Sequence, residues 1–199
     1  MTLLPKSWAD VTIRQYQLIT QIVASTNPEL EKRIELTELF IGVETTNKLT
    51  LKQLSDIDRG LSFLNAPPSE ALTLKFTIGD RSFTVEPFTQ RLTAGQYIDL
   101  THLLSVPADT INNLHNIMAV LSTEKAGYEG YEANGAVFLD SLTMDVVYPI
   151  SVFFLKLGQK LPGVIDGFLK AEMKQAMKES KAALTGSRKR VTTSIGAGT

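Results

Sequence analysis

One segment of the chain, residues 72–86, reads LTLKFTIGDRSFTVE and alternates between apolar and polar side chains. Its apolar positions follow a period of two and are Leu72, Leu74, Phe76, Ile78, Phe83 and Val85. Such a period places alternate side chains on opposite faces of a strand, and Gly79-Asp80 is a typical two-residue turn. The segment predicts a β-hairpin that packs on helices or pairs with a partner's strand, because an isolated hairpin is only marginally stable in water.

Helical patterns dominate the chain on both sides of this hairpin. Residues 12–15, 50–53 and 93–96 each read Thr-x-x-Gln. In this capping-box pattern the threonine hydroxyl and the glutamine side chain satisfy backbone N–H groups at the start of a helix. Asn27-Pro28 predicts another start, with Asn27 as the cap, and Gly42 predicts the end of that helix. The sequence therefore predicts a mainly α fold with one β-hairpin, an α+β arrangement built as a compact helical bundle.

More helices are expected after the hairpin. The helix opened by Thr93 carries an apolar set made of Tyr97, Leu100, Leu103 and Leu104. Another helix is expected from Pro107 to about residue 122, with Ile111 on its apolar side. Residues 126–135 hold three glycines and two tyrosines and predict a loop. Helices return over residues 136–141, 143–161 and 163–184, with a kink at Pro149.

Two breaks in these patterns suggest how the chain is divided. Residues 65–68 read Asn-Ala-Pro-Pro and end the first group of helices. We therefore expect an N-terminal helical unit over residues 1–65 and a hairpin with a helical pair over residues 66–125. Apolar helices follow over residues 126–184, and residues 185–199 are small, polar and basic, which predicts a flexible tail.

The composition is that of an ordinary globular protein. Of its 199 residues, 43% are apolar and 21% are charged, and the formal net charge is −1. The absence of cysteine excludes disulfides, thiolate catalysis and cysteine-based metal sites. The N-terminus has no apolar core of a signal peptide, and the longest apolar stretch, residues 144–157, is shorter than the roughly 20 residues that span a bilayer. We expect no membrane association.

The motifs of enzymes are missing from the sequence. Its two histidines, His102 and His115, fall on different expected helices and so do not form the paired ligands of a helical zinc site. The glycines of residues 127–135 lack the lysine and the preceding strand of a phosphate-binding loop, and no nucleophile elbow occurs. We therefore expect a protein without catalytic activity, cofactor or metal.

Five apolar side chains are candidates for contacts with a partner. Trp8 either fixes the entry into the first helix or anchors in another protein's pocket, and Tyr16 follows it on that helix. Val152, Phe153 and Phe154 lie in the most apolar segment. Adjacent helical residues point about 100° apart, so these three are either covered by core on a broad face or form an interface between proteins.

The C-terminal segment is the clearest electrostatic feature. From Lys170 to Thr199 it has seven basic and two acidic residues, a local net charge of +5. Arg188, Lys189 and Arg190 are its densest basic cluster and are further candidates for partner contacts. The segment is a solvated terminus, a dock for an acidic protein surface, or a nucleic-acid contact; the last is the weakest, because no aromatic residue lies near to stack on bases.

Three stretches of the chain carry a resemblance to known proteins: residues 4–16 read LPKSWxxVTxxQY, residues 92–100 read LTAGQYIDL, and residues 113–121 read NLHxIxAVL. They resemble a family of small tail-assembly proteins encoded by tailed bacteriophages. The resemblance covers roughly residues 4–121, and its motifs are helix caps and core positions. Beyond it, residues 122–135 are rich in glycine and glutamate, where the family continues with a strand-like or proline-containing segment.

The resemblance implies a non-enzymatic role in phage tail assembly. A tail assembly chaperone holds apolar segments of a long tail protein, and residues 144–157 with the hairpin edge are expected to supply its exposed apolar surface. Expected partners are other phage tail or neck proteins and further copies of the chain, with nucleic acid reached only through the basic tail. The expected location is the host cytoplasm during assembly. The alternative is a permanent ring or connector component of the neck or tail, located in the virion.

Overall fold

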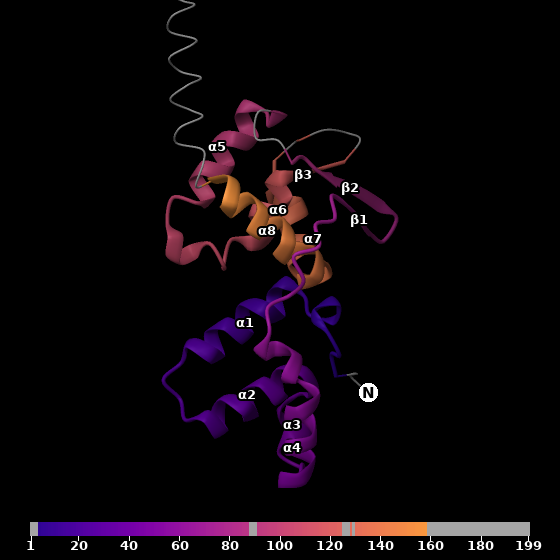
Figure 1. The fold of residues 1–199 in the computed structure, drawn as a ribbon, viewed down its shortest axis with the longest axis vertical. Coiled ribbons are helices and arrows are strands. Elements are labelled where there is room, and N and C mark those ends of the chain that lie inside the picture. The colour runs from indigo at the N-terminus through magenta and orange to yellow at the C-terminus, as the bar shows by residue number, and fades with distance from the viewer. Residues whose placement is uncertain (1–3, 88–90, 125–127, 129, 159–199) are drawn as a thin grey trace, which may run out of the picture. The chain divides into compact units, whose positions relative to one another are not determined.

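The computed structural model describes residues 4–87, 91–124, 128 and 130–158 (Figure 1). Before the hairpin lie η1 (Trp8–Asp10), α1 (Ile13–Ala24), α2 (Glu29–Ile41), α3 (Val43–Thr46), α4 (Leu51–Gly60) and η2 (Ser62–Asn65). The strands are β1 (Lys75–Ile78), β2 (Arg81–Val85) and β3 (Ser122–Thr123). The later helices are α5 (Ala94–Leu103), η4 (Pro107–Asp109), α6 (Leu114–Leu121), α7 (Glu132–Ser141) and α8 (Met144–Gly158). The predicted class, mainly α with one β-hairpin, is confirmed.

The helix starts follow the predicted chemistry in three of four cases. At Thr12, Thr50 and Thr93 the hydroxyl accepts from the backbone N–H of the glutamine three residues on, and that glutamine's oxygen accepts from the threonine N–H. The fourth prediction was wrong, because Pro28 and not Asn27 occupies the cap position of α2. The Asn27 side chain instead donates to Glu35 at 2.7 Å. Gly42 ends α2 as predicted, with a φ of 84° that favours glycine.

The hairpin has the predicted position and gains a strand that was not predicted. Gly79, with φ 60°, makes the turn between β1 and β2. β3 pairs antiparallel with the far side of β2, so the sheet order is β1-β2-β3. Arg81 ties the sheet to later elements: its guanidinium donates twice to Glu124 at 2.8 Å and once to Asn134 at 2.6 Å.

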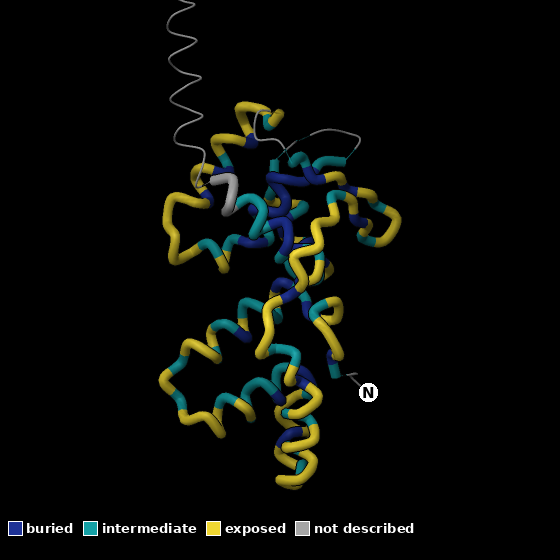
Figure 2. Tube along the Cα trace, in the orientation of Figure 1, coloured by how far each residue is buried: buried dark blue, intermediate teal, exposed yellow. Residues whose placement is uncertain are grey.

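The core gathers around α6. Figure 2 shows this helix as a buried segment, and six of its residues are buried: Leu114, Ile117, Met118, Ala119, Val120 and Leu121. Phe76 and Phe83 stack at 5.3 Å on one side of the sheet and meet the edge of Phe138 from α7. α7 lies close against α6, since Gly135 is buried beside Asn116. Aromatic pairs and close helix packing therefore join the sheet to the helices.

The first helices are joined to the last ones by backbone pairing. The N–H of Ile13 donates to Leu142, and the N–H of Met144 donates to Val11 at 2.9 Å, so α1 and α8 start from one short antiparallel bridge. The guanidinium of Arg14 also donates two hydrogen bonds to the carboxylate of Asp140, one to each oxygen. Met1–Phe154 accordingly forms one compact unit, and the boundary expected after residue 65 falls inside it.

Two expected segments differ from the structure. The helix expected from residue 107 to about 122 is divided into η4 and α6, with turns over residues 110–113. The side chain of Gln17 donates to the carbonyls of Ile111 and Asn112 at 3.0 Å, and the Ile111 carbonyl also accepts from the N–H of Leu114 in a turn. The loop expected over residues 126–135 ends earlier, because α7 begins at Glu132.

The last apolar helix runs from Met144 to Gly158 and contains Pro149. The expected helix over residues 163–184 and the expected flexible tail over residues 185–199 lie outside the described residues. Within the described part of the chain, no helix combines the length and the apolar character that crossing a bilayer requires.

Gln96 links two helices and gives a first testable expectation. Its side chain is 3% exposed; its oxygen accepts from Thr93 N–H at 3.0 Å and its amide donates to the Val120 carbonyl at 2.7 Å. That carbonyl belongs to the last turn of α6, where no partner remains within the helix. Gln96→Met should lower the free energy of unfolding by about 1–2 kcal/mol in urea denaturation. Gln53→Met, at the same capping position in an exposed helix, should cost less, and equal losses would contradict this role.

Candidate functional site

Trp8 and Tyr16, two of the predicted contact residues, meet in one aromatic cluster. The Trp8 ring packs edge-on against Tyr16 at 5.9 Å and against Phe63 at 5.6 Å. Its indole N–H donates to the carbonyl of Ala66 at 2.9 Å. Burial, and then the neighbouring Tyr148, raises the pKa of Tyr16. The Trp8 side chain thus fastens the N-terminal segment to α1, to η2 and to the residues after it, and its expected role as an anchor in another protein's pocket stays a prediction.

Val152, Phe153 and Phe154 lie together on α8 and are half-buried. The two phenylalanine rings meet edge-on at 5.4 Å, and Phe154 packs against the core. Earlier on the helix, Val147 and Ile150 are fully buried. The expectation that residues 144–157 present an exposed apolar surface is therefore wrong for the first half of α8, which belongs to the core. Arg188, Lys189 and Arg190 lie outside the described residues.

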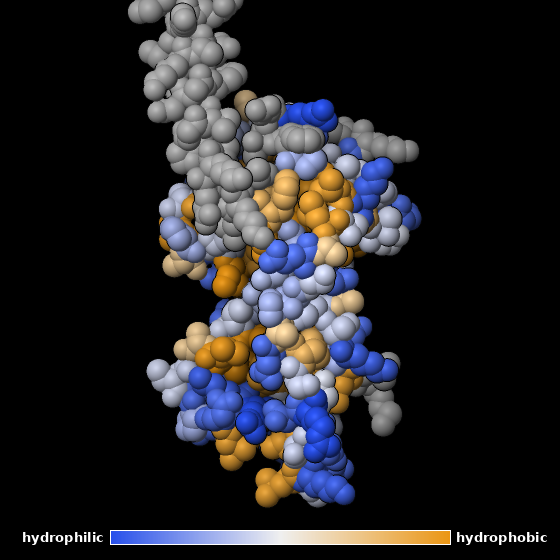
Figure 3. Space-filling model, in the orientation of Figure 1, coloured by the Kyte–Doolittle hydropathy of each residue, from blue (hydrophilic) through white to orange (hydrophobic). Residues whose placement is uncertain are grey.

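One set of exposed apolar side chains lies on α5 and the link that follows it. Other exposed apolar side chains of the described residues are spread along the first helices and the approach to the hairpin, namely Leu18, Val23, Leu30, Val43, Leu51 and Leu72. We define the α5 surface as Tyr97, Ile98, Leu104, Val106 and Ile111. The most exposed of these are Ile98 at 65% and Val106 at 50%. Figure 3 shows apolar surface over the link between α5 and α6, on the left of the view. Large apolar side chains that remain in contact with water mark candidate contact sites.

The sequence analysis grouped Tyr97 and Leu104 with Leu100 and Leu103 as one apolar set, and the structure separates them. The buried residues of α5 are Gln96, Leu100 and Leu103, whereas Tyr97 and Leu104 are exposed. The reason is that the amide of Gln96 turns inward to the end of α6, which rotates Tyr97 and Ile98 toward solvent. A usable signal was present: a 96–100–103 stripe has the same helical spacing, and it places Ile98 on the opposite face.

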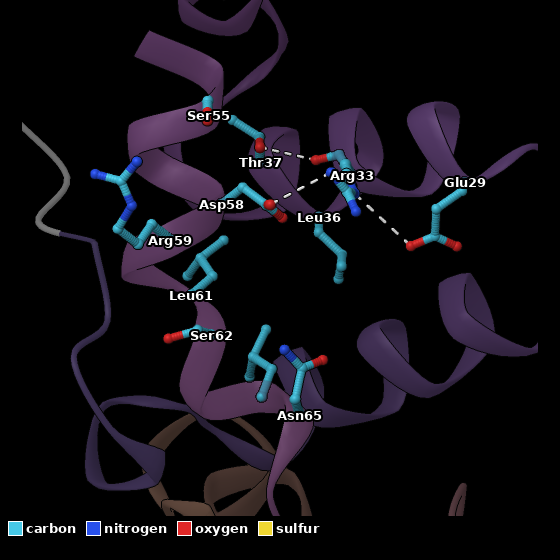
Figure 4. A pocket seen from close by; sticks show the side chains of 11 residues that line it. Glu29, Arg33, Leu36, Thr37, Ser55, Asp58, Arg59, Leu61, Ser62 and Asn65 are labelled. Atoms are coloured by element: carbon cyan, nitrogen blue, oxygen red, sulfur yellow. Dashed lines mark hydrogen bonds and ion pairs between the residues drawn. The ribbon is translucent and has the colours of Figure 1, made fainter. Parts of the chain in front are cut away.

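A second candidate site is a groove between α2 and the segment formed by α4 and η2. It encloses a cavity of about 370 Å³, within the usual range of ligand sites. Leu36, Leu61 and Leu64 form its apolar part. Figure 4 shows Arg33 above Leu36, between the carboxylates of Asp58 and Glu29. We call this site the α2–α4 groove.

The ion pairs at the α2–α4 groove are loose. Arg33 lies 3.7 Å from the Glu29 carboxylate and 3.5 Å from that of Asp58. Charge-assisted hydrogen bonds are about 2.7–2.9 Å long, so neither contact is a tight pair. Arg59 also borders the groove, but its guanidinium pairs with Asp56 at 3.4 Å. Sequence analysis did not find this site, because its residues converge only when α4 packs on α2.

The two histidines differ in how far they are buried. His102 is exposed at the end of α5, whereas His115 is half-buried near the start of α6. Burial, and then the positive charge of Arg14, lowers the pKa of His115, and its Nδ1 is buried without a hydrogen-bond partner. No group of three or more His, Asp or Glu residues converges as metal ligands in the described residues.

His115 predicts a dependence of stability on pH. Because its pKa is lower in the folded chain than in the unfolded one, the unfolded state binds the proton first as the pH falls below about 6.5. The stability that neutral His115 contributes to the folded chain is fully present above that pH. It is lost as the pH falls through the pKa of His115 in the folded chain. Denaturation at several pH values should therefore show a decline below about pH 6.5 that His115→Gln reduces. The same slope in both proteins would refute the assignment.

Comparison of the chain with known proteins identifies no relative. No protein-family model matches the chain, and no curated protein or solved structure matches it at a significant level. The α5 surface and the α2–α4 groove are therefore defined by the contacts, exposure and charges of this chain alone.

Proposed function

We propose that this chain is a non-enzymatic assembly protein of bacteriophage tails that holds apolar segments of a longer tail protein until the tail forms. The observation that carries the proposal is the α5 surface, where Ile98 is 65% and Val106 is 50% exposed. Covering such side chains with an apolar segment removes them from water, which is worth about 25 cal/mol per Å² of apolar area. The partners would be phage tail or neck proteins and further copies of the chain, in the host cytoplasm.

The sequence resemblance also supports the proposal. Of the resembling stretches, residues 92–100 contain Gln96, which fixes α5 against α6, and residues 4–16 contain Trp8, which fastens the N-terminal segment. The Gln17 side chain holds the backbone of the link at Ile111, whose own side chain is 40% exposed. The link is thus anchored by its backbone while its apolar side chains face outward. Such rigid presentation limits the conformational entropy lost on binding.

The proposal predicts that charge on the α5 surface abolishes association with the tail protein. Ile98→Asp combined with Val106→Asp should remove co-purification of the tagged full-length chain with a phage tail protein from infected cells. Thermal melting should stay unchanged, because both positions are exposed. The matched control is Leu51→Asp on α4, where the side chain is 81% exposed, and it should leave association intact.

Mass spectrometry of the co-purified proteins and of purified particles decides between the outcomes. A tail protein in the complex, together with absence of this chain from particles, would support the assembly role. A fixed copy number in every particle would instead make the chain a permanent neck or tail component. Association with no phage protein would refute both roles.

A further inference from the structure

The α2–α4 groove combines an apolar floor with an excess of acidic groups. Leu61 is 6% exposed, and Leu36 and Leu64 are half-buried beside it. Above them one guanidinium, that of Arg33, is shared between the carboxylates of Glu29 and Asp58. This trio carries a net charge of −1, and the separate pair of Arg59 with Asp56 adds none.

The two carboxylates remain available to a second cation. The side chains of Glu29 and Asp58 are 75% and 43% exposed, and both lie beyond hydrogen-bond distance of Arg33. Figure 4 shows them on either side of Arg33, with Leu36 below and Leu61 on the opposite wall. A basic side chain entering here would find carboxylates for its charge and leucines for its methylene stem. Lysine and arginine commonly bind in this way, with the stem on apolar surface and the charge at its edge.

We propose that the α2–α4 groove binds a lysine or arginine side chain, flanked by apolar residues, from a peptide segment of a protein partner. The stem lies on Leu36 and Leu64, and the charged end joins Arg33 between Glu29 and Asp58. This inference concerns a surface other than the α5 surface. It holds or fails independently of the role in tail assembly.

Charge complementarity selects this occupant over others. An acidic segment or a phosphate would have to approach Glu29 and Asp58, which repel it. A purely apolar segment would remove water from three charged groups without replacing the lost hydration, and such desolvation is costly. A cation avoids both penalties because it adds a partner to carboxylates that share one guanidinium.

The test measures binding of a fluorescein-labelled dodecapeptide of alternating lysine and leucine to the full-length chain by fluorescence anisotropy. Peptides of alternating glutamate and leucine and of alternating serine and leucine serve as comparisons. We expect the basic peptide to bind more tightly than either. Glu29→Gln combined with Asp58→Asn should weaken its binding about fivefold, as expected for two exposed ion pairs. Glu31→Gln, at an exposed carboxylate of α2 that does not line the groove, is the matched control and should leave affinity close to that of the wild type.

Arg33→Gln is a second variant, and it is expected to change the affinity for the basic peptide in the opposite direction. It removes the internal cation that competes for Glu29 and Asp58, so affinity for the basic peptide should rise. Circular dichroism melting of each variant checks that the chain is folded. The proposal is overturned if the basic peptide binds no better than the acidic one, if the double variant binds like the wild type, or if Arg33→Gln weakens binding.

Discussion

Phe138→Ala is expected to lower the free energy of unfolding by about 3–5 kcal/mol. The Phe138 side chain is fully buried, and its ring meets Phe83 edge-on at 4.9 Å and Phe76 at 5.6 Å. Alanine would leave a cavity where α7 packs on the sheet and would also remove both aromatic pairs. The loss is large because this ring joins a late helix to the hairpin, which is unstable alone.

Urea denaturation followed by far-UV circular dichroism measures this loss. Phe63→Ala is the matched control, because Phe63 is half-buried and contacts the Trp8 ring at the edge of the core. Its loss should be clearly smaller. A loss below about 1 kcal/mol for Phe138→Ala would mean that the aromatic cluster does not hold the sheet to α7.

Local signals in the sequence were enough to predict the parts of the fold that depend on neighbouring residues. The capping boxes at Thr12, Thr50 and Thr93 form within four residues, so their pattern needs no tertiary contact. The alternation around Gly79 likewise sets the register of β1 and β2 through a two-residue turn. These elements, and with them the fold class, follow from spacing alone.

Features that depend on distant contacts could not be predicted in this way. β3 has only two residues, and it exists because residues 122–123 reach β2 after α6 is packed. The turns that divide the expected helix after Pro107 accept hydrogen bonds from Gln17, which comes from α1. In both cases the hydrogen bonds concerned join residues far apart in the chain. The spacing of apolar residues within one segment does not predict such bonds.

The candidate sites show the same limit. Sequence analysis named Trp8 and Tyr16 separately as candidate contact residues, and their packing into one cluster with Phe63 appears only in the structure. The exposure of Ile98 was missed, because Gln96 was counted as a cap and not as a buried residue. The α2–α4 groove joins Arg33 to Asp58 across two helices, and no single helical pattern contains both. Exposure and convergence of charges are tertiary properties.

Gly135→Val is expected to lower the free energy of unfolding by about 3 kcal/mol. A Cβ added at Gly135 would lie 2.3 Å from the Asn116 amide oxygen, 3.4 Å from its Cγ and 3.6 Å from its Cα. Alanine could be accommodated by turning the amide away, and it gains about 1 kcal/mol of helix propensity over glycine. Valine adds two further carbons, which would approach the α6 backbone and separate the two helices that enclose the core.

Two further variants distinguish a clash from a general effect of losing glycine. Gly60→Val is the matched control, because a Cβ there meets no atom within 4 Å, and its loss should be well below that of Gly135→Val. Asn116→Ala removes the amide that lies nearest to Gly135. If contact between α6 and α7 is the cause, Gly135→Val should cost less in the Asn116→Ala background than in the wild type, so the two losses are not additive. Additive losses in urea denaturation would instead show that Asn116 does not limit the packing of α7 on α6.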